Sequence, residues 1–152
     1  IVIVMTLIVG TRDYNGSGVN IIEKAMNGEA FGFAFLLKII FTAVTIGSGF
    51  RGGEIVPTMF IGSTLGCTAA HIIGFNPCFG AALGIAAMFC GVVNCPMASL
   101  ALAAELFGGG GILFFAAAIS VSYVLSGYYG LYSSQKIMYS KLHAKFINRD
   151  VI

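Results

Sequence analysis

The hydrophobic positions of this 152-residue chain lie in runs that glycine-rich and polar breaks separate. The apolar segments fall roughly at residues 1–10, 30–46, 55–75, 79–93, 96–107 and 111–128. A perpendicular membrane-spanning helix needs about 20 apolar residues, and several of these runs are shorter. Breaks at membrane depth are tolerated only where they are buried in protein or line an aqueous cavity. The pattern therefore predicts an all-α membrane protein with short, tilted and broken helices, which is typical of an ion pathway.

The composition supports a polytopic membrane protein. Hydrophobic residues make up 58% of the chain and charged residues 9%, against about 25% charged residues in soluble domains. Between Ile55 and Gln135 the only formally charged side chain is Glu105, so no water-exposed surface can be built from that stretch. The first residues lack the features of a signal peptide, and we expect the chain to be a fragment of a longer protein.

Basic side chains follow the last apolar run: Lys136, Lys141, Lys145 and Arg149. Cytoplasmic loops of membrane proteins carry an excess of lysine and arginine, so we expect the C-terminus in the cytoplasm. The net charge of +2 is small. A few basic residues behind membrane spans do not indicate nucleic-acid binding.

Two further helices and three glycine pairs are predicted. The more polar segment 16–27 is expected to form a short helix near the membrane surface, capped by Ser17 or Asn20. Residues 131–146 are expected to form a last helix. The glycine pairs lie four residues apart, which would place each pair on one helix face and allow close packing: Gly28 with Gly32, Gly62 with Gly66, and Gly80 with Gly84.

The segment from Gly47 to Gly66 is the most informative part of the chain. A glycine-rich loop ends at Gly52 and Gly53, Glu54 follows, and Pro57 comes just before a new apolar run. Proline is tolerated in the first turn of a helix, and a helix start presents free N–H groups and a partial positive charge. The sequence therefore predicts a helix start aimed at an anion.

Glu54 has two interpretations that the residues alone leave open. A carboxylate inside a membrane is costly and is a functional candidate by default. Alternatively, an acid at a helix N-terminus complements the helix dipole, and Glu54 could also pair with Arg51. The residues alone also leave open which of three tyrosines near the last predicted helix, if any, points into the protein: Tyr128, Tyr129 or Tyr132. A tyrosine at the end of a membrane helix is most often an anchor at the membrane interface.

No cofactor, metal or enzyme motif is predicted. The Gly47–Gly52 stretch matches G-x-G-x-x-G only formally, because an apolar helix precedes it and no acid follows at the ribose-binding distance. Cys67 and His71 lie four residues apart but have no third or fourth ligand nearby. A membrane-embedded enzyme using Glu54 or His71 stays a distant alternative, since it would need a second convergent titratable group.

Several motifs, in the right order, resemble the CLC family of chloride channels and proton-coupled anion exchangers. Gly52-Gly53-Glu54-Ile55-Val56-Pro57 resembles the glycine–proline signature of the family's second half. Asn94-Cys95-Pro96-Met97-Ala98 with Glu105 resembles a later helix pair. Gly130-Leu131-Tyr132-Ser133 resembles the start of the last membrane helix, and the stretch from Asn15 to Ile22 resembles a short preceding helix.

This resemblance implies a homodimer in a bacterial plasma membrane, with one anion pathway per subunit and two inverted halves. Residues 1–146 would be the second half, 147–152 a cytoplasmic tail, and the N-terminal half would be missing. By position, the backbone N–H groups of Glu54 and Ile55 would hold the anion, and the Tyr132 hydroxyl would be its side-chain donor. Transport of chloride, as a channel or an anion/proton antiporter, is the implied function.

Two positions depart from the family pattern. Ile55 stands where phenylalanine is usual, and Glu54 adds a carboxylate beside the anion site. An acid there is similar to the fluoride/proton antiporters of the family. That branch usually has threonine just before the proline, where this chain has Val56. Fluoride/proton exchange is therefore the alternative function.

Overall fold

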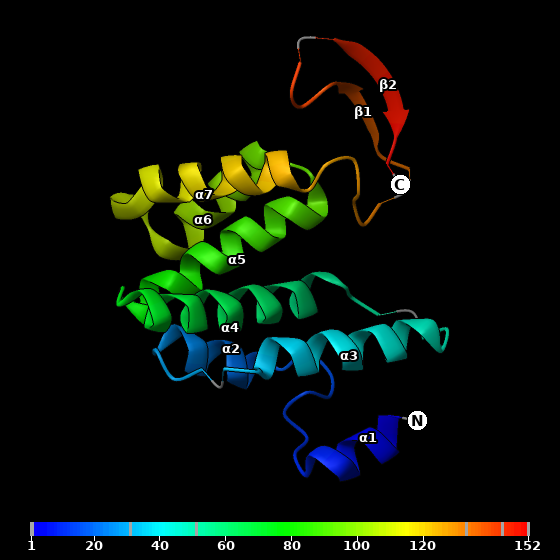
Figure 1. Ribbon diagram of the computed structural model, residues 1–152, viewed down its shortest axis with the longest axis vertical. Helices are drawn as coiled ribbons and strands as arrows, with labels where there is room; N and C mark the ends of the chain where they lie inside the picture. Colours follow the sequence, from blue (N-terminus) through cyan, green and yellow to red (C-terminus); the bar gives the residue numbers. More distant parts are fainter. Residues whose placement is uncertain (1, 31, 51, 133, 144, 152) are drawn as a thin grey trace. The chain divides into compact units, whose positions relative to one another are not determined.

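The protein is mainly helical. The structure, a computed structural model, describes residues 2–30, 32–50, 52–132, 134–143 and 145–151 (Figure 1). The elements are α1 (Val2–Val9), α2 (Val19–Met26), α3 (Ala34–Gly47), α4 (Ile55–Ile73), α5 (Pro77–Val93), α6 (Pro96–Phe107), a 3-10 turn η1 (Gly109–Gly111), α7 (Ile112–Leu125), β1 (Lys136–Tyr139) and β2 (Phe146–Asp150). The predicted apolar runs coincide with α1 and α3 to α7, so the all-α membrane pattern is confirmed for this part of the chain.

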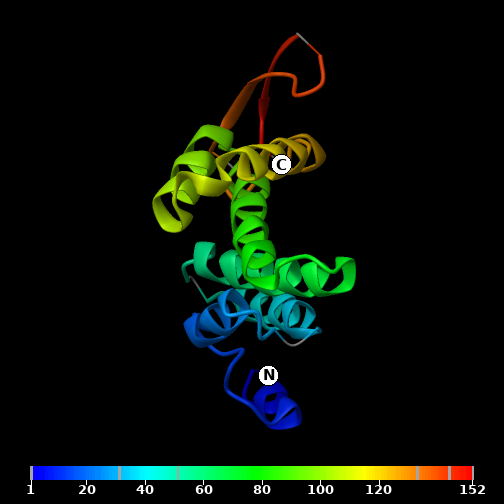
Figure 2. The same cartoon turned by 90° about the vertical axis from the view of Figure 1, so that its left-hand side faces the viewer.

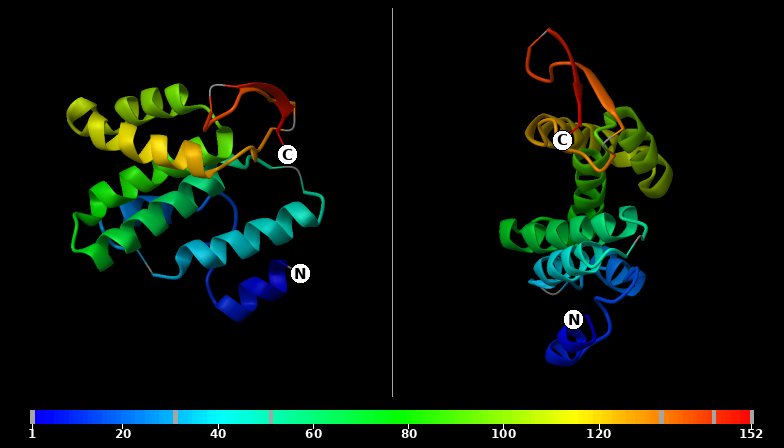
Figure 3. Two further views of the ribbon diagram at one scale, coloured as in Figure 1. Left: turned by 45° about the horizontal axis from the view of Figure 1, so that its top comes forward. Right: turned by 90° about the vertical axis from the view of Figure 1, so that its right-hand side faces the viewer.

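Two compact units divide the chain, residues 1–85 and residues 86–152. In the first unit, α2 and α3 pack against α4, and α1 lies beside α3 (Figures 1 and 3). In the second unit, η1 joins α6 to α7, which lie side by side (Figure 2), and β1 pairs with β2. Among the described helices, α4 alone is long and apolar enough to cross a membrane, with 19 residues.

Glycines bring α4 and α5 into close contact within the first unit. A Cβ added at Gly66 would overlap the Gly80 carbonyl, and one at Gly84 would overlap the Gly62 carbonyl. The predicted close packing is therefore confirmed for the pairs 62/66 and 80/84. The prediction for Gly28 and Gly32 is wrong, since Gly28 follows α2 with φ 86° and Gly32 precedes α3.

The helix starts follow local chemistry. Pro77 and Pro96 are the first residues of α5 and α6, a position where proline loses no hydrogen bond. The Asn76 carboxamide oxygen accepts hydrogen bonds from the N–H groups of Cys78 at 3.0 Å and Phe79 at 3.3 Å, which caps α5. The predicted cap of the 16–27 helix is wrong: Gly18 with φ 68° precedes α2, and no side chain caps it.

The expected last helix at 131–146 is also wrong. Within this stretch Lys136–Tyr139 form β1, which pairs antiparallel with β2 (Phe146–Asp150), so that Lys136 faces Asp150 and Tyr139 faces Phe146. The rings of Tyr139 and Phe146 meet edge to face at 5.7 Å, a contact that stabilises cross-strand pairs. Ile137 is buried while Lys136 and Met138 on either side of it are exposed, as expected where successive side chains of a strand point to opposite faces.

Candidate functional site

The first turn of α4 begins where the sequence predicted. Glu54 is the N-cap residue, and its carbonyl accepts the first helical hydrogen bond from the Thr58 N–H at 3.2 Å. Its carboxylate makes no capping hydrogen bond. Because Pro57 has no N–H, the donors of this turn are the backbone groups of Glu54, Ile55 and Val56. None of the described residues accepts a hydrogen bond from these three N–H groups, so they are free for a ligand.

The glycine-rich loop changes the chain direction between α3 and α4. Gly49 has φ 85°, and its N–H donates to the Ile46 carbonyl at 2.9 Å, which closes the end of α3. Gly52 and Gly53 do not share this positive φ, and a Cβ at either position would meet no described atom within 4 Å. The space in front of Gly52 and Gly53 is therefore open.

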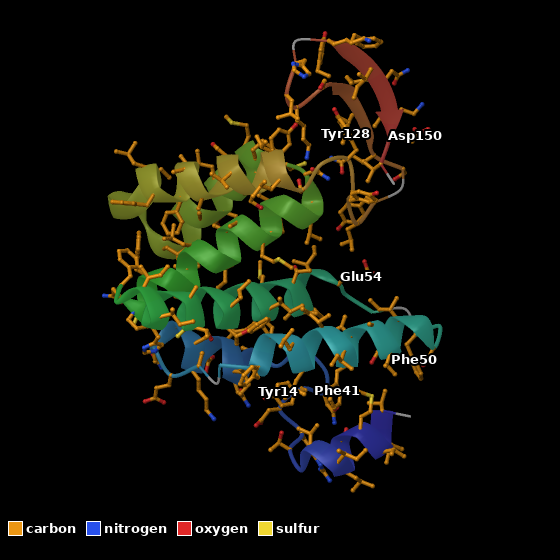
Figure 4. The ribbon with its side chains drawn as sticks, viewed as in Figure 1. Tyr14, Phe41, Phe50, Glu54, Tyr128 and Asp150 are labelled. Carbon is orange, nitrogen blue, oxygen red and sulfur yellow. The ribbon has the colours of Figure 1, made fainter. Side chains whose placement is uncertain are left out.

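A cavity of about 900 Å³ lies in the first unit and reaches the start of α4. Gly52, Gly53, Glu54 and Pro57 line it on the α4 side. Residues 14–17 line it from the loop before α2, and Lys38, Phe41, Thr42 and Thr45 line it from one face of α3. Glu54 itself is half-buried. Figure 4 shows Glu54 at the start of α4, with Phe50 in the loop before it. The cavity therefore combines backbone N–H donors, hydroxyl groups, the Glu54 carboxylate and the lysine Lys38.

Aromatic rings pack against the loop 14–17, which forms one wall of the cavity. Figure 4 shows Tyr14 and Phe41 in this part of the protein. The centroid of the Tyr14 ring lies 5.9 Å from that of Phe41 and 6.1 Å from that of Phe60. Burial raises the pKa of Tyr14, and the neighbouring Asp13 carboxylate acts in the same direction. The Tyr14 hydroxyl therefore stays protonated at neutral pH.

A buried lysine, Lys38, is hydrogen-bonded to the backbone of this loop. Lys38 in α3 is 2% exposed, and its ammonium donates hydrogen bonds to the carbonyls of Gly16 at 2.7 Å and Tyr14 at 3.1 Å. The ammonium also lies 5.0 Å from the centre of the Phe60 ring, within the range of a cation–π contact. Lys38 belongs to none of the motifs recognised in the sequence. The available signal was one lysine in the middle of the apolar run 30–46.

Tyr132 belongs to the second unit and lies in no helix, so the expected helix start at Gly130 is wrong. The Tyr132 side chain is 44% exposed. The Leu131 N–H donates to the Val92 carbonyl at 2.9 Å and fixes the backbone just before Tyr132. The two neighbouring tyrosines have other environments. The Tyr128 hydroxyl donates a hydrogen bond to the Ser140 hydroxyl at 3.1 Å, and the Tyr129 side chain is 65% exposed. The role assigned to Tyr132 stays a prediction. Arg51, the possible partner of Glu54, and Ser133 lie outside the described residues.

A polar cluster that the sequence analysis missed supports this backbone. Asn94 has φ 58° and is 7% exposed, and its amide donates to the Tyr129 carbonyl. The Lys141 ammonium donates to the Asn94 side-chain oxygen, to the Ser126 hydroxyl at 2.9 Å and to the Tyr123 carbonyl at 2.8 Å. The cluster ties the segment before β1 to the ends of α5 and α7.

Comparison with known proteins gives consistent matches. The family profile described as voltage gated chloride channel matches residues 1–127. A "Chloride/fluoride channel protein" of Pseudomonas syringae pv. tomato is 36% identical over 130 residues, which are 86% of this chain and 29% of that protein. An uncharacterized protein of Methanocaldococcus jannaschii is 33% identical over 98 residues, 61% of this chain and 25% of that protein.

A solved structure agrees with the fold. The crystal structure of a CLC-type fluoride/proton antiporter superposes with a TM-score of 0.82 and 32% sequence identity, over 86% of this chain and 33% of that one. The chain therefore spans between a quarter and a third of the length of these relatives. With a family profile matching residues 1–127, this integral membrane chain belongs to the voltage gated chloride channel (CLC) family.

Proposed function

We propose that this chain provides the second half of a CLC-type membrane domain and takes part in moving a small anion across a membrane. The observation that carries the proposal is the start of α4. The N–H groups of Glu54 and Ile55 have no partner among the described residues and lie beside a cavity that Glu54 lines. Free N–H groups at a helix start carry a partial positive charge that attracts anions.

The proposed site binds its ion through neutral or partial charges. The two backbone donors would be joined by the Tyr132 hydroxyl, as the family resemblance implies. Such donors suit a transport site, because the ion must be bound strongly enough to enter and weakly enough to leave. Gly52 and Gly53 would leave room for the ion, since a Cβ added at either position would meet no described atom within 4 Å.

The whole transporter would need partners for this chain. We propose that the inverted first half of the same protein supplies the rest of the pathway, as in transporters built from inverted repeats, and that two copies form a homodimer. The basic residues 136–149 would place the C-terminus in the cytoplasm of a bacterial cell, with residues 147–152 as a short tail. The proposed activity is transport and not enzymatic catalysis, and it requires no cofactor.

Chloride and fluoride are the two candidate substrates. The CLC motifs support chloride, either through a channel or in exchange for protons. Fluoride/proton exchange is the second candidate because Glu54 adds an acid beside the site, and because fluoride stands in the names of two relatives. Fluoride is the more strongly hydrated ion, so its site must replace more of its hydration shell.

The function is tested by reconstituting the full-length protein that contains this chain into liposomes. The liposomes are loaded with chloride or with fluoride, and efflux is followed with ion-selective electrodes while a pH electrode records proton movement. We expect efflux of at least one halide above that of protein-free liposomes. Opposed proton movement would identify an exchanger and its absence a channel. Efflux of neither halide would reject the proposed function.

A further inference from the structure

Lys38 is an unusual residue for a helix that belongs to a membrane domain. It is 2% exposed, and the only ion pair among the described residues joins Lys136 to Asp150, so no described carboxylate neutralises it. Removing a charge from water without a partner of opposite charge carries a large desolvation cost. An apolar side chain would fill this position in α3 at lower cost, so packing alone does not account for the lysine.

The contacts of Lys38 are directed at one segment. Its ammonium binds the carbonyls of Tyr14 and Gly16, which lie 24 and 22 residues earlier in the chain. These residues belong to the loop before α2 that lines the cavity, and Glu54 and Pro57 at the start of α4 line the same cavity. Lys38 therefore joins α3 to the loop wall by two charge-assisted hydrogen bonds, which are stronger than neutral ones.

The same loop also packs against α4, through Tyr14 and through Gly18, which follows the loop. A Cβ added at Gly18 would lie 2.6 Å from the Phe60 ring, and the Tyr14 ring packs against Phe60 as well. Phe60 lies in the second turn of α4, so the loop packs against this helix close to its start. A displacement of the loop would change the shape of the cavity next to the free N–H groups.

We propose that Lys38 is a positioning residue for the α4 anion site: its ammonium holds the 14–17 loop at a fixed distance from Glu54 and Ile55. The inference rests on the proposed function of that site. Anion sites built from dipoles act only when their donors and walls stay fixed while the ion sheds water. Lys38 acts through the loop and does not touch the ion.

The test uses full-length protein with Lys38→Gln, which removes the charge but keeps an amide donor, and Lys38→Arg, which keeps the charge. Lys24→Gln is the matched control, since Lys24 is exposed in α2. Halide dissociation constants are measured by calorimetry, efflux rates in liposomes, and thermal unfolding in detergent. We expect Lys38→Gln to weaken halide binding by about tenfold or more, Lys38→Arg to restore most of it, and Lys24→Gln to match the wild type.

A purely structural lysine would give a different pattern. Lys38→Gln would then lower the unfolding temperature while the folded fraction bound halide with wild-type affinity, and this result would overturn the proposal. A second variant covers poor folding of Lys38→Gln: an ester between Gly16 and Ser17 weakens the Gly16 carbonyl as an acceptor and leaves every side chain in place. We expect a two- to fivefold loss of affinity, and wild-type affinity in the ester variant would equally overturn the proposal.

The two proposals fail in different ways. If the wild type moves neither halide, the proposed function is wrong whatever the variants do. If the wild type transports a halide and either Lys38→Gln or the ester variant keeps wild-type affinity, the function stands and the role of Lys38 is wrong.

Discussion

At Glu54 the backbone and the carboxylate are expected to do different work. The N–H group would serve the anion, while the half-buried side chain turns away or carries a proton. A carboxylate and a halide at 4–5 Å repel each other by about 3–4 kcal/mol at an effective dielectric constant of about 20. We therefore expect Glu54→Gln to change the pH dependence of transport more than its selectivity.

The Glu54→Gln variant is measured as halide efflux between pH 5 and pH 8, for chloride and fluoride separately. The Glu105→Gln variant serves as the control, since Glu105 is an exposed acid in α6. A Glu54→Gln protein that exchanges one halide preference for the other with an unchanged pH profile would show that the acid is a selectivity element instead.

Tyr132 is expected to give the ion one hydrogen bond. Replacing it by phenylalanine removes the hydroxyl and keeps the ring, so Tyr132→Phe should weaken anion binding by about 0.5–1.5 kcal/mol, the usual net contribution of a hydrogen bond. Calorimetry on the full-length protein measures the effect. Tyr129→Phe is the control, because Tyr129 is largely exposed. Equal halide affinities of the Tyr132→Phe and Tyr129→Phe variants would show that Tyr132 is not the side-chain donor to the anion.

Residue-level chemistry was only partly predictable. Glu54 and Pro57 mark the helix start through local chemistry, so a sequence pattern is enough to place them. Lys38 was missed because its partners are two backbone carbonyls more than 20 residues away. No local pattern shows such a contact. The isolated lysine in an apolar run was the one available sign.

Helix boundaries followed the hydrophobic pattern closely. The run predicted at 55–75 is α4, from Ile55 to Ile73, and the run predicted at 96–107 is α6 with the same limits. Proline and glycine residues set these helix ends through their local conformational preferences. The stretch 131–146 was misread because its alternation of polar and apolar residues is short, and its pairing with Phe146–Asp150 is a contact between separate segments.

The α4–α5 contact gives a prediction about stability. Gly84→Ala would place a methyl group against the Gly62 carbonyl, and overpacking of this kind costs about 1–3 kcal/mol. Thermal unfolding in detergent should show a lower transition temperature. Gly47→Ala is the matched control, since it is also a helical glycine and a Cβ there meets nothing within 4 Å. Equal transition temperatures for the two variants would contradict the close packing.

Asn94 gives a second prediction at this scale. It is buried at φ 58° and links Tyr129, Ser126 and Lys141. Asn94→Ala removes these bonds and leaves the half-buried Lys141 ammonium with one partner fewer, so we expect a loss of about 1–3 kcal/mol in stability. Chemical unfolding of the full-length protein measures it, with Asn20→Ala as the control, because Asn20 is exposed in α2. A loss no larger than that of the control would show that the cluster is not structural.

For the whole molecule, we expect residues 1–152 alone to transport nothing. The proposed pathway needs donors from both inverted halves, and the donors assigned here are limited to Glu54, Ile55 and Tyr132. With only half of its donors present, the site would not offset the free-energy cost of removing the ion's hydration shell. The purified chain is reconstituted and compared with the full-length protein. Sustained halide efflux from the short chain, abolished by Tyr132→Ala, would show that it is a transporter by itself.

The most direct measurement removes a single backbone donor from the full-length protein. An ester in place of the amide between Glu54 and Ile55 deletes the Ile55 N–H and changes no side chain, and an ester before Ala98 in α6 is the control. Halide affinity is measured by calorimetry and efflux by ion electrode. The account predicts that the Ile55 ester weakens halide binding by about tenfold and slows efflux, while the α6 ester leaves both near wild type. Unchanged affinity and efflux in the Ile55 ester would contradict the claim that the start of α4 binds the transported anion.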